Sequence, residues 1–98
     1  MPELDEREIE TALYYEREVG EGVPIAAIAW NGEDWAVAPA KDAPPFALAT
    51  FMRRLGEPIA QKVQELTELG YLTPSRKLRA TSPTEAARAA LHAAGRAG

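Results

Sequence analysis

The pattern that most constrains the fold is the order of apolar and turn-forming residues across positions 46–91. Apolar residues at helical spacing run up to Leu55, and Gly56 ends that segment. Pro58 opens a second helical segment, which Gly70 ends. Two short apolar segments then flank a basic turn at residues 73–77, and a last helix follows. The stretch therefore predicts helix, tight turn, helix, β-hairpin and helix.

Residues 5–19 carry the signals of an additional helix at the N-terminal side. Asp5 is placed to cap this helix, and Glu8 stands three residues later as its reciprocal capping partner. Apolar residues at positions 9, 12 and 13 then share one helical face, and Gly20 supplies a stop. We expect a helix that ends near residue 19.

A hairpin is predicted across residues 23–38, where Asn31-Gly32 suits a two-residue type I′ turn. The alternation places larger apolar side chains on one face and mostly alanine on the other, a composition that lets a helix pack closely. A four-residue loop would leave the same residues on each face. The face with the larger side chains comprises Ala26, Ile28, Trp30, Trp35 and Val37.

Length and charge limit the class of protein. The 98 residues suffice for one domain, 1–98, and lack cysteine, so disulfides and thiolate metal sites are excluded. Residues 1–42 hold eleven acidic and three basic side chains, a net charge of −8, whereas residues 43–98 carry a net charge of +4. The acidic start argues against a signal peptide, and no apolar run approaches the roughly 20 residues of a membrane span. We expect a cytoplasmic protein without membrane contact.

Enzymatic chemistry has little support in the sequence. His92 is the only histidine, and no carboxylate or second histidine stands at the spacing of a metal site. No glycine-rich phosphate loop is present, and no serine has an evident base nearby. We therefore expect no catalytic residue, no metal and no cofactor, and interpret the protein as a non-enzyme.

The order of elements resembles that of winged-helix transcription regulators of the MarR and PadR kind. The resemblance rests on Leu55-Gly56 and on the spacing of apolar residues from Ile59 to Tyr71-Leu72, followed by a Thr-Ser-Pro-Thr-Glu segment at residues 81–85. It implies an α+β winged helix-turn-helix with an extra N-terminal helix and hairpin, in the order α-β-β-α-α-β-β-α. Residues 1–42 would form the acidic addition and residues 43–98 the helix-turn-helix, wing and last helix.

The resemblance also implies a small regulator that binds double-stranded DNA as a homodimer. The second of the two helices would enter the major groove, and the basic turn would contact phosphates or the minor groove. The residues expected at this interface are Arg53, Arg54, Gln61, Lys62, Gln64, Arg76, Lys77 and Arg79.

An alternative follows from the charges on the same helix. Glu57, Glu65 and Glu68 lie on its outward face beside the two glutamines, and carboxylates repel a polyanion. The chain is then an interaction module that presents this face, or the acidic N-terminal helix, to a protein partner. Trp30 and Trp35 could serve as a dimer face or line a ligand pocket.

Overall fold

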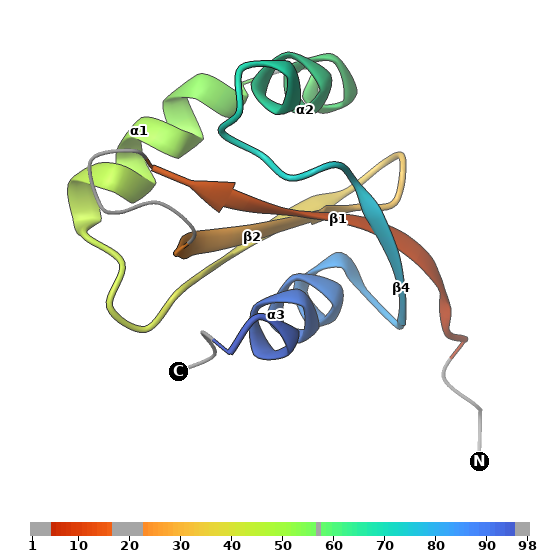
Figure 1. Cartoon of the computed structure of the whole chain (residues 1–98). Helices are drawn as coiled ribbons and strands as arrows, with labels where there is room; N and C mark the ends of the chain where they lie inside the picture. The colour runs from red at the N-terminus through yellow and green to blue at the C-terminus, as the bar shows by residue number, and fades with distance from the viewer. Residues whose placement is uncertain (1–4, 17–22, 57, 96–98) are drawn as a thin grey trace.

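The computed structural model describes residues 5–16, 23–56 and 58–95. They form a four-stranded antiparallel sheet with α1 and α2 on one face and α3 on the other (Figure 1). The α+β class predicted from the sequence is confirmed. The sheet order is β3-β2-β1-β4. The elements in chain order are β1 (Arg7–Tyr15), β2 (Pro24–Trp30), β3 (Trp35–Pro39), α1 (Pro45–Leu55), α2 (Ile59–Glu68), β4 (Arg76–Ala80) and α3 (Pro83–Ala93).

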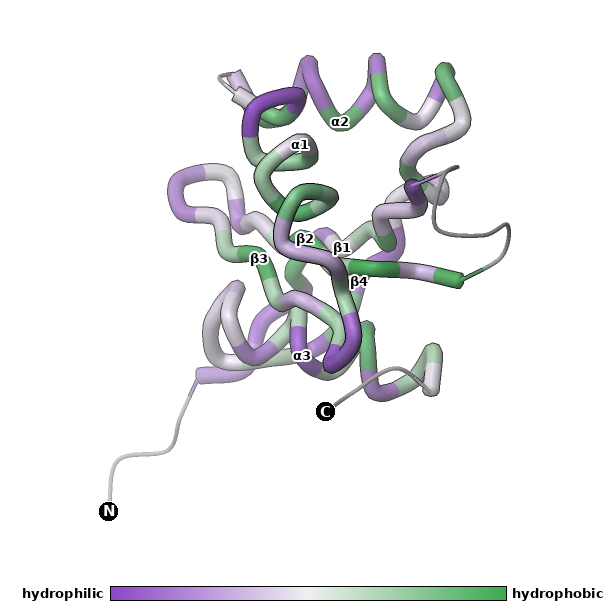
Figure 2. The backbone as a smooth tube through the Cα atoms, turned by 90° about the vertical axis from the view of Figure 1, so that its left-hand side faces the viewer, coloured by the Kyte–Doolittle hydropathy of each residue, from purple (hydrophilic) through white to green (hydrophobic). Residues whose placement is uncertain are grey.

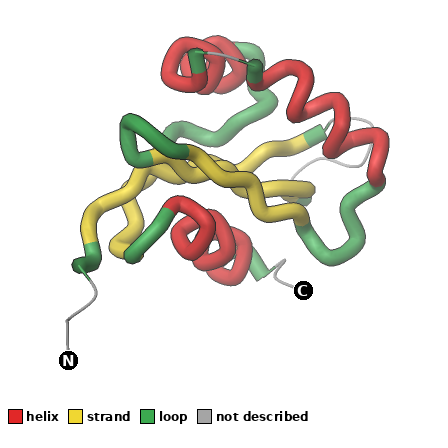
Figure 3. The backbone as a smooth tube through the Cα atoms, turned by 180° about the vertical axis from the view of Figure 1, so that it is seen from behind, coloured by secondary structure: helices red, strands yellow, loops and turns green. Residues whose placement is uncertain are grey.

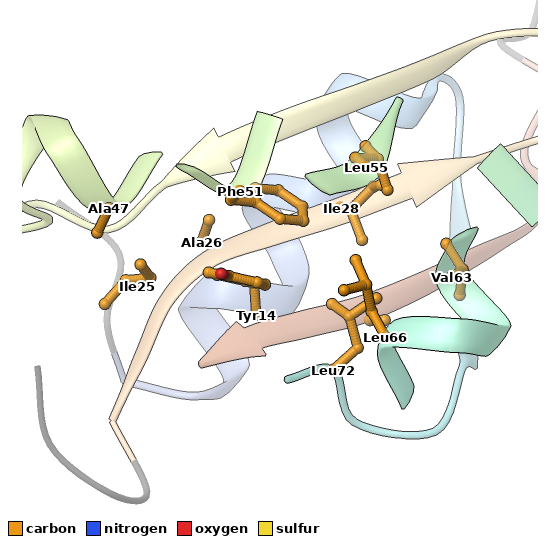
Figure 4. Packing of buried hydrophobic residues seen from close by; sticks show 11 residues of the cluster. Tyr14, Ile25, Ala26, Ile28, Ala47, Phe51, Leu55, Val63, Leu66 and Leu72 are labelled. Carbon is orange, nitrogen blue, oxygen red and sulfur yellow. The ribbon is translucent and has the colours of Figure 1, made fainter. Parts of the chain in front are cut away.

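The upper half of the core lies between the sheet and the pair α1 and α2 (Figure 4). Phe51 of α1 packs on Tyr14 of β1, with ring centroids 4.2 Å apart. Val63 and Leu66 of α2 face the same cluster and are almost fully buried. This narrow stripe is all that α2 contributes, so the remainder of its surface faces outward.

The lower half of the core is an alanine seam between the sheet and α3. Ala27 and Ala29 of β2 meet Ala86, Ala87 and Ala90 of α3. Small side chains on both surfaces let the helix axis approach the sheet closely. The predicted packing of a helix on the alanine face is confirmed, and Figure 2 shows the strands held between α1 and α2 above and α3 below.

The predicted N-terminal helix is wrong, because Arg7–Tyr15 forms strand β1. Ile9 packs on the α3 side and Tyr14 on the α1 side, as the twofold alternation of a strand requires. Apolar residues occur on both faces because β1 is internal, and such a run also satisfies helical spacing. Pairing with β2 and β4 decided the outcome. The expected helix end near Gly20 lies outside the described residues.

The predicted hairpin across residues 71–80 is also wrong. Leu72 forms a bridge with Tyr14 of β1, and β4 pairs with the preceding half of β1, so both segments lie along one partner rather than on each other. Pro74 cannot donate a backbone hydrogen bond and interrupts this edge. The element order is therefore β-β-β-α-α-β-α and not the predicted winged-helix order.

The β2–β3 hairpin is correct in face but not in turn type. Trp30 pairs with Trp35, so residues 31–34 form the loop in place of a two-residue turn. The Asn31 side chain accepts hydrogen bonds from the backbone N–H groups of Glu33 (2.9 Å) and Asp34 (2.8 Å). This Asx-type capping stabilises the longer loop, and Gly32 adopts a φ of 99° within it. The side chains that were predicted to share a face do share it.

The alanine seam gives a testable expectation for stability. Ala87→Leu should lower the free energy of unfolding by about 1–3 kcal/mol, because the buried site has no room for three more carbon atoms. Ala89→Leu, on the exposed side of the same helix, should change it by less than about 0.5 kcal/mol. Urea unfolding followed by circular dichroism checks both, and equal effects would contradict tight packing at the seam.

Candidate functional site

A groove lies between α2 and the β2–β3 hairpin. One hollow of about 520 Å³ is bordered by Trp30 and Trp35 and by the start of α2. A second of about 480 Å³ lies between Trp30, α2 and the segment around Pro74. The two hollows share Trp30 and Ala60, so they form one continuous groove with an aromatic wall.

The sequence explains why the groove forms here. Trp30 and Trp35 are paired in register, so their side chains stand on the same face of the sheet. Both are only partly buried, since α2 covers this end of the sheet with its narrow apolar stripe. Ala60, on the groove side of α2, is too small to fill the space beside the indole of Trp30.

The groove is acidic. Four carboxylate side chains line it, from β1, the hairpin loop and the end of α2, while no lysine or arginine belongs to the lining among the described residues. Gln64, Thr67 and Ser75 add neutral polar groups. Because the walls carry one sign of charge beside aromatic surface, the groove attracts cations. The four carboxylates are Glu10, Glu33, Asp34 and Glu68.

Arg54, expected at a DNA interface, is instead held inside a polar network. Its guanidinium donates to the Tyr14 hydroxyl at 2.9 Å and forms an ion pair with Glu16 at 3.3 Å. It also lies over the Tyr71 ring, 4.2 Å from the centroid. The Glu16 side chain is 8% exposed, so Arg54 compensates a buried charge and connects the end of α1 to β1.

The same network binds the Tyr14 proton tightly. The Tyr14 hydroxyl donates to Glu16 at 2.9 Å. Burial, and then the hydrogen bond to the Glu16 carboxylate, raise the pKa of Tyr14 to about 12. Neutral Tyr14 is thus the form that the fold requires.

The predicted groove-reading side chains of α2 do not form a DNA-facing surface of one kind. Gln61 donates to Glu65 at 3.4 Å, and Lys62 forms an ion pair with the same carboxylate at 3.1 Å. Gln64 lines the acidic groove. Glu57 lies outside the described residues.

The cations of β4 lie on the exposed edge of the sheet. Lys77 forms an ion pair with Glu8 at 3.8 Å, and Arg79 one with Glu6 at 4.0 Å. Arg76 is opposite Thr11 and lines a different hollow, of about 310 Å³, on the α3 side. Exposed pairs of this kind are weak, so the side chains stay available to other anions.

The structure does not bring the eight predicted residues together. Arg54 contacts Tyr14, whereas Lys77 pairs with Glu10 four residues away along β1, which separates the two sites by roughly 13 Å. Arg53 is exposed at the end of α1. The predicted face of Trp30 and Trp35, in contrast, does form one site.

Sequence reasoning identified the two tryptophans but missed Glu10 and Glu68 as members of that site. Glu10 was assigned to a helix, which hides its place opposite Lys77 and beside Trp30 on the sheet. Glu33 and Asp34 carried a usable signal, since they directly precede Trp35 in the hairpin loop.

Comparisons with protein families, with curated proteins and with solved structures give no match for this chain. Within the described part of the chain, no group of three or more His, Asp or Glu side chains is arranged to hold a metal ion. A search of the same residues for a helix with the length and apolar character of a membrane span finds none.

The Tyr14 network predicts a late titration. The difference in tyrosinate absorbance between the wild-type protein and Tyr14→Phe should have its midpoint near pH 12 rather than near the ordinary value of about 10. The folded chain keeps this proton to a higher pH than the unfolded chain. The contribution to the free energy of unfolding is therefore complete below about pH 10 and declines as pH rises toward 12. A midpoint near 10 would show that the network does not bury Tyr14.

Proposed function

We propose that this protein is a protein-interaction module whose groove binds a positively charged segment of a partner protein. The observation that carries this proposal is the combination of an aromatic wall, from Trp30 and Trp35, with carboxylates on every side of the groove. Lysine and arginine side chains suit both features, because their methylene chains pack on indole rings while their charged ends reach carboxylates.

The distribution of charge elsewhere supports the same function. Lys62, Lys77 and Arg79 each form an ion pair with a glutamate, and Arg54 compensates Glu16. Three of the four groove carboxylates, Glu33, Asp34 and Glu68, are exposed and have no ion-pair partner among the described residues. They can therefore interact with a partner without breaking an internal contact.

The test uses the two tryptophans as reporters, since the chain has no others. A short peptide of alternating lysine and leucine should change their fluorescence on binding, and the affinity should fall with added salt. The triple variant Glu10→Gln/Asp34→Asn/Glu68→Gln should bind on the order of tenfold more weakly, given a few tenths to 1 kcal/mol for each exposed charge contact.

A matched control has the same net charge. The variant Asp5→Asn/Glu6→Gln/Glu8→Gln removes three carboxylates outside the groove lining and should bind nearly as well as the wild type. Equal losses in both variants would reduce the interaction to net charge. An unchanged fluorescence at saturating peptide would eliminate the groove as the site.

A second candidate function is binding of double-stranded DNA by a transcriptional regulator, and the exposed cations Arg76, Lys77 and Arg79 on β4 favour it. Fluorescence anisotropy with a random-sequence duplex measures it directly. Binding should weaken steeply between about 50 and 200 mM salt, and replacing the three cations by alanine should reduce affinity for all sequences. Undetectable binding at low salt would eliminate this candidate.

A further inference from the structure

Strand β3 forms one edge of the sheet and pairs only with β2. Two hydrogen bonds fix which of its backbone groups face inward: Asn31 N–H donates to the Asp34 carbonyl at 3.1 Å, and Ala40 N–H donates to the Ile25 carbonyl at 2.8 Å. In an antiparallel pair the backbone groups alternate between inward and outward. The positions between Asp34 and Ala40 that face outward are therefore 35, 37 and 39.

This outward edge presents donors and acceptors with no backbone partner in the part of the chain that the structure describes. Trp35 and Val37 each offer an N–H and a C=O, while Pro39 offers only its C=O. The five side chains of β3 carry no charge, whereas the opposite edge, β4, carries Arg76, Lys77 and Arg79. Lysine and arginine on an edge strand discourage pairing with another strand, so only β4 has this protection.

The two helix layers leave this edge accessible. Figure 3 views the molecule from the side opposite to Figure 1, with α1 and α2 above the sheet and α3 below it. Trp35, Ala36 and Val37 all remain partly exposed at the edge. An uncharged, accessible edge with unsatisfied backbone groups is a template for a further strand.

We infer that β3 pairs antiparallel with β3 of a second copy of this chain, about a twofold axis at Val37. In this register the two Val37 residues exchange N–H···O bonds, and each Trp35 N–H donates to the Pro39 carbonyl of the second copy. Pro39 is used only as an acceptor, which is the one role that it can fill. A shift of the axis to Pro39 would place two residues without an N–H opposite each other.

Charge complementarity supports the same register. Continuing the pairing beyond the strand places Glu33 opposite Lys41 of the second copy, at both ends of the interface. Both side chains are exposed, and neither forms an ion pair within the described residues. Opposite charges facing each other across antiparallel segments stabilise pairing.

Symmetry favours this partner over pairings that involve β4. Two β4 strands would bring like charges together. A β3–β4 contact between copies would leave one edge of each kind free and continue as an open filament. The β3–β3 pair closes into a dimer with one eight-stranded sheet, because each four-stranded sheet contributes its own β3 edge.

The first experiment measures the monomer–dimer equilibrium by sedimentation. Val37→Pro removes the outward N–H without touching a bond to β2, and proline is tolerated on edge strands. It should raise the dimer dissociation constant about tenfold or more, since both Val37 bonds are lost by symmetry. Val37→Thr keeps the N–H and the β-branched shape, and should dimerise within about threefold of the wild type. A monomeric wild type, or a Val37→Pro protein that dimerises normally, would overturn the inference.

The second experiment uses exposed charges and so does not depend on the stability of the strand. Glu33→Lys and Lys41→Glu should each weaken the dimer, and the double variant Glu33→Lys/Lys41→Glu should restore it. Hydrogen exchange at Trp35 and Val37 should slow as the wild-type concentration rises. Additive losses in the double variant, or exchange at these two amides that is independent of concentration, would rule out this interface. No part of either experiment requires a ligand in the groove.

Discussion

The structure depends on the pairing of β1 with neighbours on both of its edges. β1 holds β2 along one edge and the segment from Leu72 to β4 along the other. Tyr15 N–H donates to the Tyr71 carbonyl at 2.8 Å, and Thr73 N–H donates to the Leu13 carbonyl at 3.1 Å. These bonds carry the chain from α2 down the side of the sheet. The position of α2 above Trp30, and hence the groove, follows from that path.

Local signals predicted the parts of the fold that local chemistry determines. Ser82 accepts a hydrogen bond from the Glu85 N–H at 3.3 Å at the start of α3, and α1 ends at Leu55 before Gly56, as the sequence indicated. Gly70 has a φ of 86° and releases the chain from α2. Each of these features depends on residues within a few positions of one another, so that no distant partner is needed to predict them.

Long-range pairing was the part that the sequence did not reveal. Residues 7–15 satisfy helical spacing at Ile9 and Ala12 and strand alternation equally well, and only contact with residues 24–30 and 72–80 decides between them. The candidate site inherited this error. Trp30 and Trp35 were recognised because their hairpin is local, whereas Glu10 and Glu68 join them only through tertiary packing.

The connection between β1 and β4 also has a consequence for how the molecule assembles. Thr11 donates its hydroxyl to the Arg76 carbonyl at 3.0 Å across 65 positions of sequence. Closing so long a loop is slow, because its entropic cost precedes any gain from the contact. During synthesis β1 leaves the ribosome early and keeps one edge open until residues 72–80 emerge. The interval in which this strand can pair with a wrong neighbour is set by the order of elements along the chain.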